Sequence, residues 1–323
     1  MTPRMHSNLL GTQPFRHEAL FYGGDEELLN SLEPFVRDGV RAGEKVLVVL
    51  GPAKLESLRA ALGRDSKKVA FADMDEVGAN PARIMPLWSA FVDDLAPGQG
   101  ARGVGEPVTS ARKAAELAEC QLHESLLNLA FAGAPRFWLL CPYDTTALSG
   151  AVLDEARTSH ASIRSPVHLP VASALYEQAD SFGALAGRDL PAAPEGAVNF
   201  LVDGEGVGSS RRRVHDFALQ FGFYDGAAAD YALAVHEVIA NSLKHGGGRA
   251  HVTIWGEGDN LICEVRDRGR FHEPMAGRQH PVNDSQSGRG LWMANQLCDL
   301  VQIRNLPRGT AVRLHKHLRS ARD

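Results

Sequence analysis

The chain has 323 residues, a length that predicts two domains. Hydrophobic residues make up 44% and charged residues 23% of the chain, as in soluble globular proteins, and its net charge of −5 predicts no direct binding to nucleic acid. No apolar run approaches the length of a membrane span, and the N-terminal residues lack an apolar signal core, so we expect a cytoplasmic protein without membrane attachment.

Residues 15 to about 175 alternate between strand and helix patterns. The continuous apolar run KVLVVL, residues 45–50, is typical of a buried parallel strand. Further strands are predicted at 17–22, 68–72 and 136–141, with a strand edge within 98–105. Helices are predicted at 25–40 with Asp25 as N-cap, and at 53–62, 81–95, 111–132 and 148–159. This alternation predicts a parallel sheet with helices on both faces.

The turn after KVLVVL does not have the pattern of a phosphate-binding loop. Such a loop requires G-x-x-x-x-G-K-[ST], in which backbone amides surround the phosphates and the lysine reaches them. The chain reads GPAKLESL, so Gly51 and Lys54 are present but the second glycine and the G-K-S/T end are missing. We interpret the segment as an ordinary turn from strand to helix, and the domain as a sensor of an unidentified signal or small molecule.

The four cysteines, Cys120, Cys141, Cys263 and Cys298, show no C-x-x-C spacing. We expect reduced, mostly buried side chains, with a redox or metal-binding role as the less favoured alternative.

Residues 176–197 are rich in Ala, Gly and Pro and are predicted to form a linker. The remaining residues, 198–318, are predicted to form a second domain. Strands are expected at 198–202, 250–255, 261–266, 301–304 and 311–315, and helices at 209–221 with Ser209 or Ser210 as cap, at 230–245 and at 291–300. These elements predict an α/β sandwich in which one mixed sheet is covered by helices on one side.

The helix that ends at residue 245 carries two polar residues on one side. Its apolar residues recur at helical spacing, and Glu237 and Asn241, four residues apart, point the same way. The helix should end at the run Gly246–Gly248. A carboxylate and a carboxamide therefore stand side by side just before a glycine break.

Two further segments complete a candidate site. A strand ends in Asp267-Arg268-Gly269, and Ser287-Gly288-Arg289-Gly290 precedes a helix, where backbone amides can approach an anion. Together the three segments could hold a magnesium nucleotide, with Asn or Glu near the metal, Asp on a base amine and glycines around the phosphates. The alternative readings are an exposed carboxylate and carboxamide, a turn-forming Asp and generic glycine turns.

The order E-x-x-x-N, D-x-G, G-x-G and a closing Gly309-Thr310 resembles the Bergerat (GHKL) ATP-binding fold, which includes histidine kinases, gyrase and MutL. Within that family, HEVIANSLKHG and SGRGLWMANQLCDLVQIRNLPRGTAVRLH most resemble the anti-sigma regulatory serine/threonine kinases. The resemblance covers residues 195–318. It implies an ATP and Mg²⁺ site made by Glu237, Asn241, Asp267, Gly269, Gly288, Arg289, Gly290 and Thr310.

The resemblance also implies a role for each of these residues. Glu237 would polarise the attacking hydroxyl or water, and Asn241 would bind the magnesium ion. Asp267 would accept a hydrogen bond from the adenine amine, beside a water held by Thr310. The glycines would keep the lid and phosphate loop open, with Arg289 near the phosphates.

Two positions depart from the family pattern. Arg270-Phe271 follows Gly269 where a second glycine is usual, and Gln286 stands where the anti-sigma kinases carry an arginine that contacts the γ-phosphate, although Arg289 lies nearby. Because arginine contributes strongly to phosphoryl transfer, these departures bear on kinase activity more than on nucleotide binding.

The first domain has its own resemblance. HEALFYGGDEELL, the GEP at residues 105–107, ECQLHESLLNLAF and CPYDTTALS resemble the MEDS sensory domain, which is related to the regulator DcmR and to RecA/KaiC-like ATPases. The resemblance covers residues 14–170, within a domain predicted at 14–175.

Together the resemblances imply a bacterial signalling protein that phosphorylates a STAS-like anti-sigma antagonist on Ser or Thr and so controls a sigma factor. Kinases of this type are usually homodimers. The alternatives are an ATP-binding partner-switching module without catalysis, and a histidine-kinase-like sensor. The latter is weakened because paired dimerisation helices are missing, and His123-Glu124 is better explained by a structural histidine.

Overall fold

The computed structural model describes residues 15–134, 136–166, 168–176, 183, 186–281 and 288–318. The chain divides into two compact units, Met1–Phe182 and Gly183–Asp323, and this division falls within the segment predicted as a linker. In the described part of the chain, no helix combines the length and the apolar character needed to cross a membrane.

A seven-stranded sheet forms the centre of the first unit, with strand order β3-β2-β4-β5-β1-β6-β7. Its strands are β1 (Phe15–Tyr22), β2 (Lys45–Leu50), β3 (Ala70–Asp73), β4 (Ala101–Gly105), β5 (Phe137–Asp144), β6 (Ser162–Ser165) and β7 (His168–Ala172). All neighbouring strands pair in parallel except β6 and β7, which are antiparallel. The expected parallel sheet is therefore present, with an additional antiparallel edge strand.

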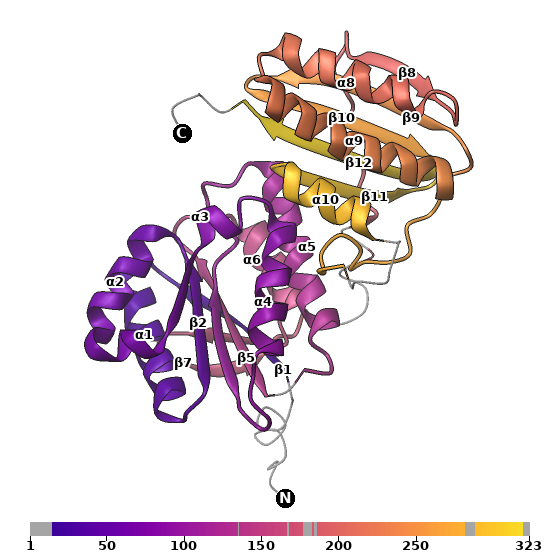
Figure 1. Cartoon of the computed structure of the whole chain (residues 1–323). Helices are drawn as coiled ribbons and strands as arrows, with labels where there is room; N and C mark the ends of the chain where they lie inside the picture. Colours follow the sequence, from indigo (N-terminus) through magenta and orange to yellow (C-terminus); the bar gives the residue numbers. More distant parts are fainter. Residues whose placement is uncertain are drawn as a thin grey trace, which may run out of the picture. The chain divides into compact units, whose positions relative to one another are not determined.

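Helices cover both faces of this sheet, as predicted (Figure 1). They are α1 (Asp25–Arg41), α2 (Pro52–Leu62), α3 (Met74–Val77), α4 (Ile84–Asp93), α5 (Ala114–Ala130) and α6 (Gly150–Ser159), with 3-10 turns η1 (Gly63–Lys68) and η2 (Pro81–Arg83). On one face, alternate β2 residues Val46, Val48 and Leu50 pack with α1 and α2. On the other face, the Trp88 ring of α4 lies against Gly103 of β4.

The structure corrects several predictions for the first unit. Helix α1 begins at Asp25, so the N-cap is Gly24 and Asp25 lies in the first turn, where its charge favours the helix dipole. Strand β4 lies between β2 and β5 and not at an edge. The segment 81–95 is divided, because Asn80 caps the separate turn η2 through its side-chain oxygen before α4 begins.

A five-stranded sheet with order β11-β12-β10-β9-β8 forms the second unit. Its strands are β8 (Val198–Val202), β9 (Ala250–Glu257), β10 (Asn260–Asp267), β11 (Leu300–Leu306) and β12 (Gly309–His317). The prediction of a mixed sheet is wrong, since every neighbouring pair is antiparallel. Short turns join β9 to β10 and β11 to β12, and such turns can connect only antiparallel neighbours.

Three helices, α8 (Val207–Phe221), α9 (Asp225–His245) and α10 (Arg289–Leu297), cover one face of this sheet (Figure 1). Alternate strand residues such as Cys263, Val265 and Leu314 point toward them and join one hydrophobic core with Val235 and Ile239 of α9. This is the α/β sandwich that the sequence predicted.

Helix ends in the second unit differ from the predictions. Helix α8 begins at Val207, so Ser209 and Ser210 lie in its first turn and their hydroxyls donate to Gly206 O and Val207 O. Helix α10 begins at Arg289 and ends at Leu297, because Leu300 already belongs to β11. All four cysteines are free and buried, as predicted.

Candidate nucleotide site

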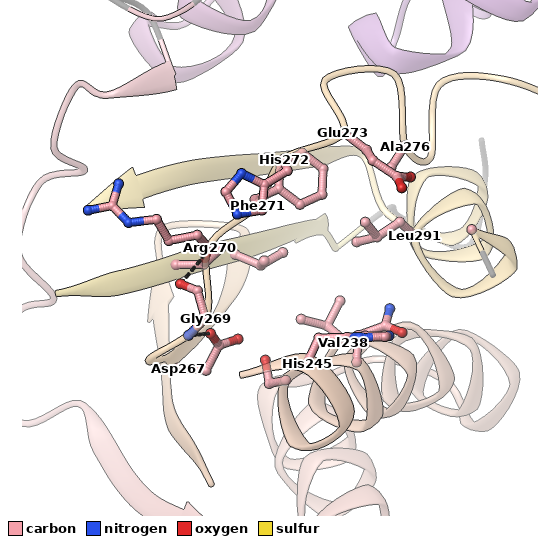
Figure 2. Close-up of a pocket in the computed structure, with 15 residues that line it drawn as sticks. Val238, His245, Asp267, Gly269, Arg270, Phe271, His272, Glu273, Ala276 and Leu291 are labelled. Atoms are coloured by element: carbon pink, nitrogen blue, oxygen red, sulfur yellow. Dashed lines mark hydrogen bonds between the residues drawn. The ribbon is translucent and has the colours of Figure 1, made fainter. Parts of the chain in front are cut away.

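A cavity of about 290 Å³ opens in the second unit beside the C-terminal half of α9. Its other walls are formed by the end of β10, the segment after it, the N-terminus of α10 (Figure 2) and the start of β12. Of the predicted site residues, those that line it are Asn241, Asp267, Gly269, Gly288 and Thr310. Four segments far apart in the sequence, the last of them the start of β12, therefore meet at one concave surface.

Glu237, Arg289 and Gly290 lie outside this lining, but Gly290 connects α10 to the polar pair of α9. A Cβ atom added to Gly290 would lie 2.9 Å from Glu237 Oε2 and 3.1 Å from Asn241 Nδ2. With a side chain at this position, α10 could approach this closely only if the ends of the Glu237 and Asn241 side chains shifted. Glu237, Asn241 and Gly290 thus form a compact group beside the cavity.

Asp267 is held in a fixed position at the end of β10. Its Oδ1 accepts a hydrogen bond from Gly269 N at 2.7 Å, and Thr310 Oγ1 donates to Gly269 O at 3.0 Å. Asp267 pairs with Thr310 across the sheet. Gly309 has a φ of +143°, and a Cβ there would fall 1.8 Å from Asp267 O. The chain can therefore pass Asp267 this closely only with glycine at position 309.

The segment 269–277 forms a wall that the sequence did not predict. Arg270, Phe271, His272, Glu273 and Ala276 all line the cavity (Figure 2). In the sequence, Arg270 and Phe271 are visible only as the place where a second glycine is missing. The rest of the segment shows neither a regular spacing of apolar residues nor a recognisable motif.

Two asparagines hold this wall at its ends. Asn305 of β11 accepts from Phe271 N at 2.9 Å and donates to Phe271 O at 2.7 Å. Asn295 of α10 donates to Gly277 O at 2.9 Å. The wall is therefore attached to both the sheet and α10, so it moves with them unless these bonds break.

The N-terminus of α10 opens onto the cavity through Gly288 and Leu291. The first backbone bond of the helix runs from Trp292 N to Gly288 O at 3.2 Å, so the amides before Trp292 have no acceptor within the helix. Such amides bind anionic groups well. Arg289 is exposed in the first turn, and the predicted contributions of Ser287 and Gln286 lie outside the described residues.

The end of α9 also contributes to the cavity. His245 lines it, whereas Lys244 is exposed and not part of the lining. Ser242, one residue after Asn241, lines it too. Of these two neighbouring basic residues, only His245 borders the cavity.

Comparison with known families finds two matching regions, and the boundary between the two units of the fold lies between these regions. Residues 16–161 match the family model "MEDS: MEthanogen/methylotroph, DcmR Sensory domain", and residues 202–316 match "Histidine kinase-like ATPase domain". The chain therefore contains a MEDS domain followed by a histidine kinase-like ATPase domain. The two domains together indicate a signalling protein that has a sensory domain and a kinase-like ATPase domain. A search of curated proteins gives no match for the chain.

The ATPase domain implies ATP binding, usually with Mg²⁺, and the residues around its cavity suit that ligand. Asn241 and Glu237 offer oxygen atoms, which are the ligands that Mg²⁺ prefers. The amides of α10 suit phosphate, and the Asp267 carboxylate suits an exocyclic amine. The cavity volume lies close to the lower end of the range for small-molecule sites, about 300 to 1,000 Å³.

Proposed function

We propose that this protein is an anti-sigma-type serine/threonine kinase. It binds Mg-ATP in the cavity of the ATPase domain and phosphorylates a Ser or Thr of a STAS-like anti-sigma antagonist, which then controls a sigma factor. A cytoplasmic location and a homodimer belong to the same proposal. One observation supports it most: Asn241, Asp267 and the N-terminus of α10 border one cavity, and Glu237 lies one helical turn from Asn241.

Each group would have a separate task. Asn241 would hold Mg²⁺, which supplies charge neutralisation between the phosphates. The amides at the start of α10 would bind phosphate oxygens, and Asp267, fixed by Gly269 and Thr310, would select adenine. Glu237 would polarise the Ser or Thr hydroxyl of the antagonist, so that its oxygen attacks the γ-phosphorus as the bond to ADP breaks.

A second candidate is an ATP-dependent binding module that does not transfer phosphate. It is favoured by Gln286, which stands where the resembling kinases carry an arginine. In Figure 2 the Arg270 side chain extends away from the other labelled residues, so its guanidinium is not aimed at the middle of the cavity. A histidine-kinase-like reaction is disfavoured because His123 is buried, with 1% of its surface exposed.

Calorimetry of Mg-ATP binding to the full chain is the first test. Wild type should bind, and Asn241→Ala should not. Labelled ATP then separates the candidates: acid-stable label on a purified STAS-domain antagonist, lost in Glu237→Gln, supports the kinase. Binding without transfer supports the binding module, and acid-labile label on the chain itself supports a histidine kinase. Absence of Mg-ATP binding to wild type contradicts all three.

A further inference from the structure

Four side chains with metal-ligating atoms meet in the core of the MEDS domain. His17 lies on β1, Cys141 on β5, Glu124 on α5, and His160 directly follows α6. All four are buried, and one ligating atom from each lies within 4.8 Å of the others. Imidazole, carboxylate and thiol groups meet here without any role in the ATP site, which belongs to the other domain.

Three of the distances within this cluster are close to those of a small coordination sphere. His17 Nε2 lies 3.0 Å from Glu124 Oε2 and 3.3 Å from Cys141 Sγ. His160 Nε2 lies 3.4 Å from Glu124 Oε2. In a tetrahedral zinc site with bonds near 2.0 Å to N or O and near 2.3 Å to S, neighbouring ligand atoms are about 3.3 to 3.7 Å apart.

Hydrogen bonds outside the cluster fix the tautomers of both histidines. Asn128 donates through Nδ2 to Ser159 O at 2.7 Å, so its Oδ1 must face His17 Nδ1, 3.1 Å away. Nδ1 of His17 therefore carries the proton. Nδ1 of His160 lies 2.8 Å from Ala156 O and donates to it. Both Nε2 lone pairs consequently point into the cluster, as in metal-binding histidines whose other nitrogen donates to an outer carbonyl.

This arrangement leaves more hydrogen-bond acceptors than donors inside the cluster. Two Nε2 lone pairs and the Glu124 carboxylate all accept hydrogen bonds, and only the Cys141 thiol can donate. Within the described part of the chain, Glu124 Oε1 and His160 Nε2 have no hydrogen-bond partner. A buried negative charge among acceptors needs a cation.

We propose that His17, Glu124, Cys141 and His160 bind one divalent transition-metal ion, with Zn²⁺ as the best match. The set of two nitrogens, one oxygen and one sulfur suits Zn²⁺ and excludes Mg²⁺ and Ca²⁺, which require oxygen ligands. Binding forms a bond to the Cys141 sulfur and releases its thiol proton to solvent. Four protein ligands leave no open position, so the ion joins β1, β5, α5 and α6 as a structural centre.

The test uses the full chain, purified under reducing conditions without chelator. Elemental analysis should find about one equivalent of Zn²⁺, and replacement by Co²⁺ should give tetrahedral visible bands and a near-ultraviolet thiolate-to-cobalt band. Cys141→Ser should lose the near-ultraviolet band, and His160→Ala should bind the metal at least tenfold more weakly. Cys120→Ser is the matched control, since Cys120 is also buried in this domain but outside the cluster, and it should keep both signals.

Two results overturn the proposal: wild type that takes up no stoichiometric Zn²⁺ or Co²⁺, or Cys141→Ser that keeps the near-ultraviolet band. If Cys141→Ser does not fold, X-ray absorption at the zinc edge of the wild-type chain decides. One sulfur with nitrogen and oxygen ligands supports the assignment, and a shell of nitrogen and oxygen alone contradicts it.

Discussion

Lys54 and Glu106 form an ion pair in the MEDS domain, close to the carboxyl ends of β2 and β4. Lys54 Nζ donates to Glu106 Oε1 at 2.7 Å, and Tyr22 OH donates to the same oxygen at 2.5 Å. Lys54 is the lysine that follows the strand KVLVVL, where a phosphate-binding loop would place a phosphate ligand. Here its ammonium group neutralises a carboxylate with only 2% of its residue surface exposed, which agrees with an ordinary strand-helix turn.

We therefore expect Lys54→Met to lower the free energy of unfolding by about 3 to 5 kcal/mol at neutral pH, because a buried carboxylate loses its cation. Burial already raises the pKa of Glu106, against the opposing effect of Lys54. Without Lys54 this pKa rises further, so the folded state gains stability as pH falls and Glu106 takes up a proton. Urea unfolding at pH 7.5 and 5.5 should show a smaller loss at the lower pH.

Lys68→Met is the control, since Lys68 pairs with Asp65 at the surface with 66% of its side chain exposed. It should change stability by less than about 1 kcal/mol. A loss in Lys54→Met that is equally small, or that grows as pH falls, would show that Glu106 does not depend on this cation.

Asn128 is the residue that orients His17 toward the proposed metal. Asn128→Ala should weaken Zn²⁺ binding by about 10- to 100-fold, because the imidazole loses the acceptor that fixes its tautomer. Competition with a chromogenic chelator measures this change. Ser125→Ala, which changes a buried residue of the same helix, should bind as wild type does. An unchanged affinity in Asn128→Ala would mean that the Nδ1 contact does not support metal binding.

At the scale of the elements, the ATP site depends on how closely α10 approaches α9. Gly290→Ala places a methyl group 2.9 Å from Glu237 Oε2, so α10 must move or the Glu237 side chain must turn. We expect Mg-ATP binding to weaken at least tenfold, measured by calorimetry. Gly208→Ala is a matched control: Gly208 is likewise the second residue of its helix, and a Cβ there meets nothing within 4 Å. Equal binding by both variants would contradict a close α9–α10 contact as a requirement of the site.

The elements that the sequence predicts well are those whose signals are local. KVLVVL forms a buried strand, as its continuous run of apolar residues predicts. Helix α9 ends at its run of glycines, as the conformational freedom of glycine predicts. Both signals lie within a few consecutive residues. Strands β6 and β7 were not predicted: they are short, and β7 is mostly exposed. The central place of β4 was missed because ARGVG is neither alternating nor continuously apolar.

Features that depend on long-range contacts could not be predicted. The wall 269–277 depends on Asn305 and Asn295, which have no motif of their own. His17 and Glu124 are 107 residues apart, so no spacing rule connects them. The residues of the ATP site were expected together only because a resemblance supplied their order. Cysteine spacing predicted no metal site, since Cys141 is the cluster's one sulfur and its other ligands come from three other elements.

The whole molecule consists of two compact units, each with its own hydrophobic core. One core joins α8, α9 and α10 to the antiparallel sheet, and another joins α1 and α2 to the parallel sheet. Cooperativity within a core exceeds that between separate cores, so the units should unfold in separate steps. The ligand of each unit should then stabilise its own step.

Scanning calorimetry of the full chain should accordingly show two transitions. Mg-ATP at 100 times its dissociation constant stabilises the unit that binds it by about 2.7 kcal/mol, which raises one midpoint by roughly 5 to 10 °C. Zn²⁺ should raise only the other midpoint. Asn241→Ala should remove the first shift and Cys141→Ser the second, each variant keeping the remaining one. A single transition that both ligands raise would mean that the two units unfold as one cooperative body and would contradict this prediction.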